Sequence, residues 1–219
     1  MLQGVHDHAG YNIEVPPHWN GDLVLWAHPL MGTAPVLSTD TPEFGLRQLL
    51  VDEGYAWAAS TFADTGFAVG SGVETTHDLA LLAARLLHRQ PNRRYIVGIS
   101  MGGQVATRSL EEYPKFYSGA MPMCGSLGDD TLFDYVADVN LTAQALSGIR
   151  AYPTPSDYQS TVVPAIVNKL GLTAEGPQTA AGRQYQSIVV QRSGGVRPGA
   201  NEAFNFWVPN GLFQLDLAD

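Results

Sequence analysis

Apolar residues follow two different patterns in the first part of the chain. Residues 22–28 and 55–61 form short, almost uninterrupted apolar runs, which are typical of strands buried on both faces. Residues 74–88 instead repeat apolar side chains at helical spacing, at Leu79, Leu82, Ala83 and Leu86. Buried strands that alternate with amphipathic helices predict an α/β protein with a mostly parallel sheet and helices on both faces.

The same patterns predict the remaining elements of this part. Further strands are expected at residues 11–15, 94–100 and 117–125, and helices at residues 41–54 and 101–113. The first helix begins with Thr-Pro-Glu and ends with glycine, which are common start and stop residues of helices. Pro114 ends the second helix.

The chain changes character after residue 128. Helices are expected near residues 132–146, 161–170 and 180–191, with turns rich in proline and glycine between them, and no further buried strand is recognisable. We therefore predict an α/β core over residues 1–128 and a helical, cap-like segment over residues 129–219. The two together are expected to form a single structural unit, which fits a chain of 219 residues.

The charge balance narrows the classes of partner. Lys and Arg number 12 against 21 Asp and Glu, a formal net charge of -9 without any basic stripe, so we do not expect nucleic acid binding. No apolar run is long enough to span a bilayer, which predicts a soluble protein without a membrane span. The N-terminus lacks the pattern of a signal peptide, which leaves the compartment undecided.

Cys124 is the single cysteine, so an intrachain disulfide is impossible. Because no histidine follows it, we expect a small buried residue at the end of a strand rather than a nucleophile. His6 and His8 alternate near Asp7, as metal ligands can, but two histidines in a flexible terminus are weak support for a metal. We predict neither a metal nor another cofactor.

The strongest chemical signal is the run Gly98-Ile99-Ser100-Met101-Gly102. Small residues at its ends let a strand turn sharply into a helix, which holds a serine at the tip in a strained conformation where it can attack a substrate. The run lies between an apolar strand and an amphipathic helix, as such a nucleophile elbow requires. The Met101 N–H at the start of the helix is the expected first donor to an oxyanion.

Together with the segments that precede it, this run resembles the α/β-hydrolase superfamily, and in particular its bacterial serine esterases. The resemblance covers about residues 11–127 and includes His28-Pro29-Leu30, where the family often has His-Gly-X. It implies that the N–H of Leu30 is the second oxyanion donor and that His28 is a buried hydrogen-bonding residue. Phe62 follows a strand at the edge where such sheets bind ligands, so it either lines an acyl pocket or only packs.

The usual partners of the serine are missing from their usual place. In this superfamily an acid and then a histidine follow the serine, at the ends of later strands. Here every histidine precedes Ser100, and His77 and His88 are expected near the ends of a helix, facing solvent. Several carboxylates follow Ser100, but none ends a recognisable strand; they are Asp129, Asp130, Asp134, Asp138, Asp157, Asp216 and Asp219.

Two explanations remain open for the missing base. The chain is either the front part of a longer hydrolase, with its last strands lost or supplied by a second polypeptide, or a complete protein with altered machinery. An apolar edge strand at residues 117–125 favours the first explanation. The tail of the chain supports the first explanation too, because its many large apolar residues are expected to pack against a partner surface. These residues are Phe204, Phe206, Trp207, Leu212 and Phe213. We therefore expect a homo-oligomer or a complementing second chain.

These observations predict a serine carboxylic-ester hydrolase that acts through an acyl-enzyme on Ser100. Its substrate would be an aromatic, acyl or polyester ester, and the sequence does not choose between them. One alternative is an interaction module that keeps the fold with impaired or absent catalysis. Another is peptidase, amidase or acyltransferase activity through the same serine.

Overall fold

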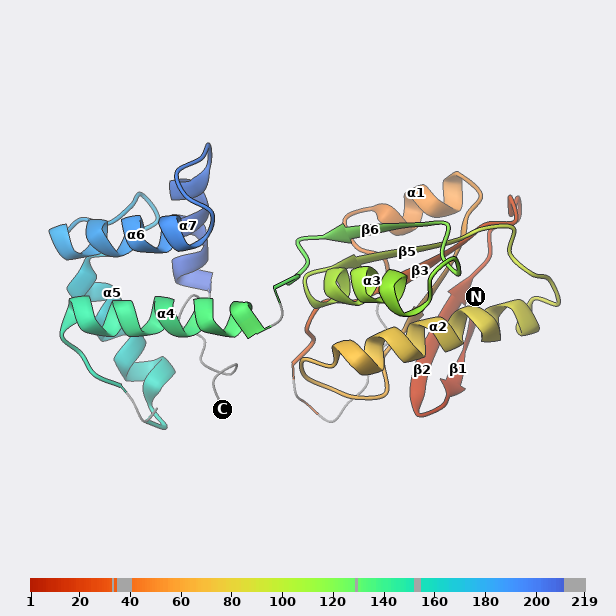
Figure 1. Cartoon of the computed structure of the whole chain (residues 1–219), viewed down its shortest axis with the longest axis horizontal. Helices are drawn as coiled ribbons and strands as arrows, with labels where there is room; N and C mark the ends of the chain where they lie inside the picture. The colour runs from red at the N-terminus through yellow and green to blue at the C-terminus, as the bar shows by residue number, and fades with distance from the viewer. Residues whose placement is uncertain (33, 35–40, 129, 152–154, 211–219) are drawn as a thin grey trace. The chain divides into compact units, whose positions relative to one another are not determined.

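The computed structural model describes residues 1–32, 34, 41–128, 130–151 and 155–210. The chain divides into two compact units, a sheet unit at Met1–Leu127 and a helical unit at Gly128–Asp219 (Figure 1). Among the described residues, no helix is long and apolar enough to cross a membrane.

The sheet unit is built on six strands in the spatial order β1-β2-β4-β3-β5-β6. Strands β1 and β2 form an antiparallel hairpin, β2 pairs antiparallel with β4, and β4, β3, β5 and β6 run parallel to one another. In chain order the strands are β1 (Leu2–His6), β2 (Ala9–Glu14), β3 (Leu23–Ala27), β4 (Ala56–Ser60), β5 (Arg94–Ile99) and β6 (Gly119–Met123). The predicted mostly parallel sheet is confirmed.

Three helices cover the two faces of this sheet: α1 (Leu46–Asp52), α2 (Val69–Leu86) and α3 (Met101–Glu112). Helix α1 lies on one face, and α2 and α3 lie on the other (Figure 1). Alternation along each strand explains this arrangement, because successive side chains point to opposite faces. In β3, Leu25 packs in the cluster with α2 and α3, whereas Trp26 packs in the cluster with Leu50 of α1. Helices on both faces are thus confirmed.

Three expectations for the sheet unit were wrong in detail. The flexible terminus is strand β1, whose residues are mostly exposed and therefore lack the buried pattern that marks a strand in sequence. Helix α1 begins at Leu46, after Gly45 in the left-handed region (φ 76°), rather than at residue 41. Helix α2 begins at Val69, five residues before the predicted start.

The helical unit contains α4 (Asp130–Ser147), a π-helical turn at Tyr158–Val162, α5 (Val163–Leu170), α6 (Ala180–Arg192) and α7 (Ala200–Asn210). This unit has a hydrophobic core of its own, which includes Val139, Ile166, Leu170 and Tyr185. Within the described part of this unit there is no strand, in agreement with the sequence.

Helix α7 is the element of this unit that the sequence did not predict. Phe204 is buried within the unit, with its ring 5.5 Å from that of Tyr185, so it needs no outside partner. Phe206 and Trp207 are 61% and 58% exposed. Leu212 and Phe213 of the aromatic tail lie outside the described residues.

Candidate functional site

Ser100 lies at the junction between the end of β5 and the start of α3. Its backbone has φ 55° and ψ -121°, a combination that non-glycine residues rarely adopt and that costs on the order of 1–3 kcal/mol. The backbone is held on both sides. The Ser100 N–H donates to the Met123 carbonyl at 2.9 Å, and the Ser100 carbonyl accepts from the Gly103 N–H at 2.9 Å.

The two glycines of the motif are required by close backbone contacts. A Cβ atom at Gly98 would overlap the carbonyl of Gly102. A Cβ atom at Gly102 would overlap the carbonyl of Ala27 and lie 2.7 Å from the carbonyl oxygen of His28. Real Cβ atoms essentially never come so close, so the first turn of α3 packs directly against the backbone at the end of β3. The sequence pattern therefore corresponds to a strained strand-to-helix turn.

The parallel strands bring three loops together at one edge of the sheet. Strand β5 lies between β3 and β6, with Ala27 in register with Gly98 and Ile99 in register with Met123. The chain positions that follow β3, β5 and β6 are His28, Ser100 and Cys124. Adjacent strands are about 4.8 Å apart, so these residues occupy neighbouring positions along the carboxyl edge.

The two expected oxyanion donors lie at the start of α3 and in the loop after β3. Met101 is the first residue of α3, so its N–H has no acceptor four residues earlier in the helix. Leu30 follows β3 and is 37% exposed. The loop that contains Leu30 is anchored by a hydrogen bond from the Gly66 N–H to the Gly32 carbonyl at 3.0 Å. The roles of Met101 and Leu30 as donors stay predictions.

His28 is buried, with 5% of its surface exposed. Its Nδ1 lies 2.6 Å from the Pro29 carbonyl oxygen, which can only accept, so Nδ1 carries the proton. The imidazole stacks on Phe62 with ring centroids 3.9 Å apart. Its Nε2 is buried and has no hydrogen-bond partner among the described residues. The structural role of His28 stays a prediction.

Phe62 is fully buried, and it occupies the left-handed region at φ 59°. Its N–H donates to Ser60 Oγ at 3.1 Å, and its ring packs in a cluster with Val73, Met101 and Val105. Phe62 therefore packs beside the first turn of α3, and its role as the lining of an acyl pocket stays a prediction.

The fold of this chain also occurs in solved structures. A proline iminopeptidase from Mycobacterium smegmatis matches with a TM-score of 0.51 and 12% identity, over 85% of this chain and 64% of its own. This chain has the α/β-hydrolase fold. At such identity the match establishes the fold alone.

Two further matches to the α/β-hydrolase fold have lower scores. A thermostable carboxyl esterase from Bacillus coagulans has a TM-score of 0.45 and 13% identity, over 98% of this chain and 72% of its own. An acetyl xylan esterase from Aspergillus awamori has a TM-score of 0.44 and 15% identity, over 54% of this chain and 49% of its own. This chain thus spans 49% of that esterase and 64% of the iminopeptidase. No protein-family model matches the sequence, and no curated protein matches it.

Of the six histidines, His28 is the one that lies beside Ser100, because it follows β3 and β3 pairs with β5. His6 and His8 belong to the hairpin of β1 and β2, and β1 is four strands from β5, about 19 Å at the usual strand spacing. His18 precedes β3, so it lies at the opposite edge of the sheet from His28.

The two histidines of the α2 region are also remote from Ser100. His77 stacks on Tyr113, with ring centroids 3.8 Å apart, and Tyr113 lies one helix length, about 20 Å, beyond Ser100. The expectation that His77 faces solvent was wrong, because its side chain is 17% exposed and Phe116 also packs on it. His88 is exposed, as predicted, just after α2.

Among the described residues, no carboxylate makes a hydrogen bond or ion pair with Ser100 or His28. Asp134, Asp138 and Asp157 belong to the helical unit, where Asp138 pairs with Arg192. Asp129, Asp216 and Asp219 lie outside the described residues, and Asp130 begins α4. The described residues also hold no group of three or more His, Cys, Asp or Glu that could bind a metal ion.

Cys124 differs from its prediction. It is a free, exposed cysteine with φ 50°, rather than a small buried residue. The physical reason is its place just beyond β6, which is the last strand of the described sheet and has exposed residues of its own. Sequence reasoning therefore missed an accessible side chain next to the candidate nucleophile.

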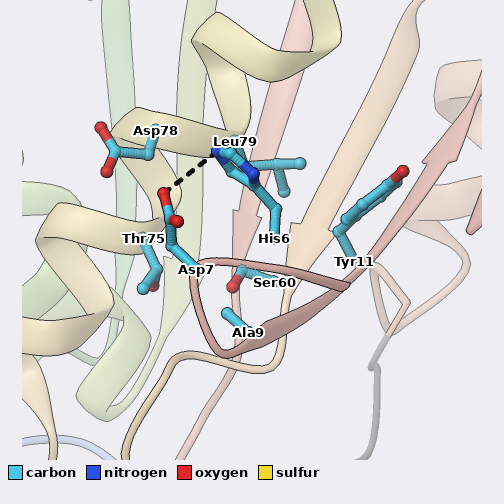
Figure 2. A pocket seen from close by; sticks show the side chains of 8 residues that line it. All are labelled: His6, Asp7, Ala9, Tyr11, Ser60, Thr75, Asp78 and Leu79. Carbon is cyan, nitrogen blue, oxygen red and sulfur yellow. Dashed lines mark ion pairs between the residues drawn. The ribbon is translucent and has the colours of Figure 1, made fainter. Parts of the chain in front are cut away.

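A separate small hollow, with a cavity volume of about 20 Å³ and partly open to solvent, lies between the first hairpin and α2. Figure 2 shows its lining, in which the His6 ring pairs with the Asp7 carboxylate at 3.2 Å; α2 contributes Asp78 to the lining. Ser60 lines it, but Ser100 does not. This hollow is therefore not the substrate site of the Ser100 turn.

Proposed function

We propose that this chain is a serine hydrolase that cleaves carboxylic esters through an acyl-enzyme on Ser100. The observation that carries the proposal is the backbone of Ser100, which is held at φ 55° by contacts that tolerate only glycine at positions 98 and 102. Strain of this kind is concentrated at functional sites, where it presents a reactive group. The esterase names of several fold neighbours agree with the proposal, but the fold alone does not establish it.

In the proposed reaction, the Ser100 oxygen bonds to the ester carbonyl carbon and the carbonyl oxygen becomes an oxyanion. The N–H groups of Met101 and Leu30 stabilise that oxyanion. The bond to the alcohol then breaks, and water later cleaves the acyl-enzyme to release the acid. Aromatic, acyl and polyester esters all remain candidate substrates.

The hydroxyl proton of Ser100 needs an acceptor. His28 is beside Ser100 along the sheet edge, but its Nε2 makes no hydrogen bond to any described residue. General base catalysis typically contributes about 10²–10⁴-fold in rate, so we expect slow turnover that favours esters with good leaving groups. A homo-oligomer or a second chain that supplies a base remains part of the proposal, as do the core and cap-like roles of the two units.

A second candidate is a non-catalytic interaction module of the same fold. One observation favours this candidate. Among the described residues, no histidine that is hydrogen-bonded to an acid lies next to Ser100, since the two observed His–Asp pairs are at His6 and His77. Peptidase, amidase and acyltransferase activities would use the same serine and are secondary outcomes of the test below.

A fluorophosphonate probe separates the two candidates, because it bonds only to an activated serine. The proposal expects stoichiometric labelling that maps to Ser100, lost in Ser100→Ala and after heat denaturation. Ser160→Ala is the matched control, because Ser160 is an exposed serine of the helical unit. Absence of labelling in the folded wild-type chain would favour the interaction module.

A further inference from the structure

Backbone contacts on both sides fix the position of Cys124 next to Ser100. Ile99 and Met123 are in register, and the Ser100 N–H donates to the Met123 carbonyl at 2.9 Å. A Cβ atom at Gly103 would lie 2.8 Å from the Cα of Gly125, so the chain after β6 packs on the first turn of α3. Cys124 lies between these two anchor points, Met123 and Gly125. Its position relative to the serine is thus set by backbone contacts.

Cys124 and the oxyanion loop lie on opposite sides of the serine. The sheet order places β3 on one side of β5 and β6 on the other. Leu30 follows β3, whereas Cys124 follows β6. When a substrate carbon is bonded to the Ser100 oxygen, its oxyanion must point toward the β3 side to reach the Leu30 N–H. One of its remaining substituents, the acyl chain or the alcohol, then extends toward the β6 side.

We propose that Cys124 forms the β6-side wall of the substrate site and that its small side chain admits a bulky acyl group there. This inference rests on the proposed function of Ser100. The exposure of Cys124 agrees with it, because a wall residue must face the space that the substrate enters. The side chain at position 124 therefore sets the size limit for the acyl chain.

The single cysteine allows a test on the folded protein without a mutation at the site. The thiol of Cys124 is converted either to a small S-methyl disulfide or to a bulky aromatic maleimide adduct. The rate of labelling at Ser100 is then measured with a short-chain and a long-chain alkyl fluorophosphonate, whose alkyl group takes the place of the acyl chain. The maleimide adduct should slow the long-chain probe about tenfold or more relative to the short-chain probe, the scale on which a pocket discriminates by size. The S-methyl group should have a smaller effect.

A matched control moves the thiol to the far edge of the sheet. The double variant Val5→Cys/Cys124→Ala carries it in β1, where position 5 is 78% exposed, and maleimide should not alter the ratio of the two labelling rates. Cys124→Trp offers a second route that needs no thiol reagent and should reproduce the loss of the long-chain probe.

The outcomes separate this inference from the proposed function. If Ser100 labels with both probes and their ratio is unchanged by either the adduct or Cys124→Trp, position 124 is not a wall of the site. If the adduct slows both probes equally, Cys124 affects access without setting acyl size, which also overturns the inference. If the short-chain probe fails to label the unmodified chain, the function of Ser100 is refuted and the inference with it.

Discussion

The backbone N–H of Ser100 donates a hydrogen bond to the carbonyl oxygen of Met123, at 2.9 Å. This bond continues the ladder between β5 and β6 one residue past the end of β5, into the turn itself. The strained serine is therefore a fixed part of the sheet edge rather than the tip of a loose loop. Its conformation should respond to substitution in a way that separates stability from function.

The first prediction compares two substitutions of the serine. Ser100→Ala should abolish fluorophosphonate labelling and ester hydrolysis with little change in stability, because alanine meets the same strain at φ 55°. Ser100→Gly should also be inactive, yet raise the free energy of unfolding by about 1 kcal/mol, since glycine adopts positive φ without strain. Urea unfolding and p-nitrophenyl ester assays measure both effects. An unchanged esterase rate in either variant would place the activity elsewhere.

The second prediction concerns the glycines that frame the turn. Gly98→Ala and Gly102→Ala should each destabilise the sheet unit by about 3 kcal/mol or more, because the new methyl group overlaps backbone carbonyls that cannot move freely. Gly70→Ala is the control, since a Cβ there meets nothing within 4 Å and α2 gains a better helix former. Thermal unfolding followed by circular dichroism makes the comparison. Equal stability of all three variants would contradict the close packing of α3 on β3.

The third prediction concerns Glu14, whose carboxylate joins two parts of the sheet unit. It accepts from Trp57 Nε1 at 2.7 Å and pairs with Arg47 at 2.7 Å, and its side chain is 18% exposed. Glu14→Ala should cost about 2–3 kcal/mol, because the buried indole N–H loses its acceptor. Glu111→Ala removes an exposed pair with Arg108 and should cost no more than about 0.5 kcal/mol. Similar losses in the two variants would show that the buried network adds nothing.

The fourth prediction follows from Tyr117, where burial raises the pKa of the phenol well above its ordinary value of 10.0. The folded state keeps its proton while the unfolded state releases it above about pH 10, so folding stability should fall as the pH rises beyond that point. Tyr117→Phe should lessen this loss and move the alkaline unfolding transition to higher pH. Tyr11→Phe, at a half-buried tyrosine, is the comparison. The urea midpoint at pH 8 and pH 11 reports the difference, and identical pH dependence in wild type and Tyr117→Phe would refute the argument.

The fifth prediction concerns association at β6, one of the two edge strands of the described sheet and the parallel one. Light scattering should give a mass about twice 23.6 kDa or larger. Met123 pairs with β5, so by alternation the backbone of Pro122 faces the outer edge, where proline offers no N–H. Pro122→Val restores that donor and should strengthen the association. A monomer at all concentrations in both proteins would refute an interface at this edge.

Sequence reasoning succeeded where local signals and tertiary packing agree. The apolar run of β3 and the glycines around Ser100 each have a local cause, namely burial on both faces and backbone contact, and both were recognised. Strand β1 was missed because its residues are exposed and it is held by its partner β2, which no local pattern reveals. The prediction that Cys124 is buried was wrong for a related reason. A residue at the end of an edge strand is buried only if another element covers it, and the residue itself does not reveal this.

The site residues divide in the same way. Ser100 and Met101 follow from one continuous segment, so the sequence could place them. His28 was assigned a structural role by resemblance, and its hydrogen bond to Pro29 and stacking on Phe62 could only come from the folded chain. The misjudged exposure of His77 has the same origin, because Tyr113 and Phe116 reach it from another element.

Among the described residues, the hydrogen bonds and close contacts that fix the Ser100 turn come from residues 27–125, within the sheet unit, and the helical unit has a hydrophobic core of its own. Selection on the nucleophile geometry therefore acts through residues of the sheet unit. Over evolutionary time this leaves positions 98 and 102 almost no freedom, because a single methyl group at either one would overlap backbone atoms.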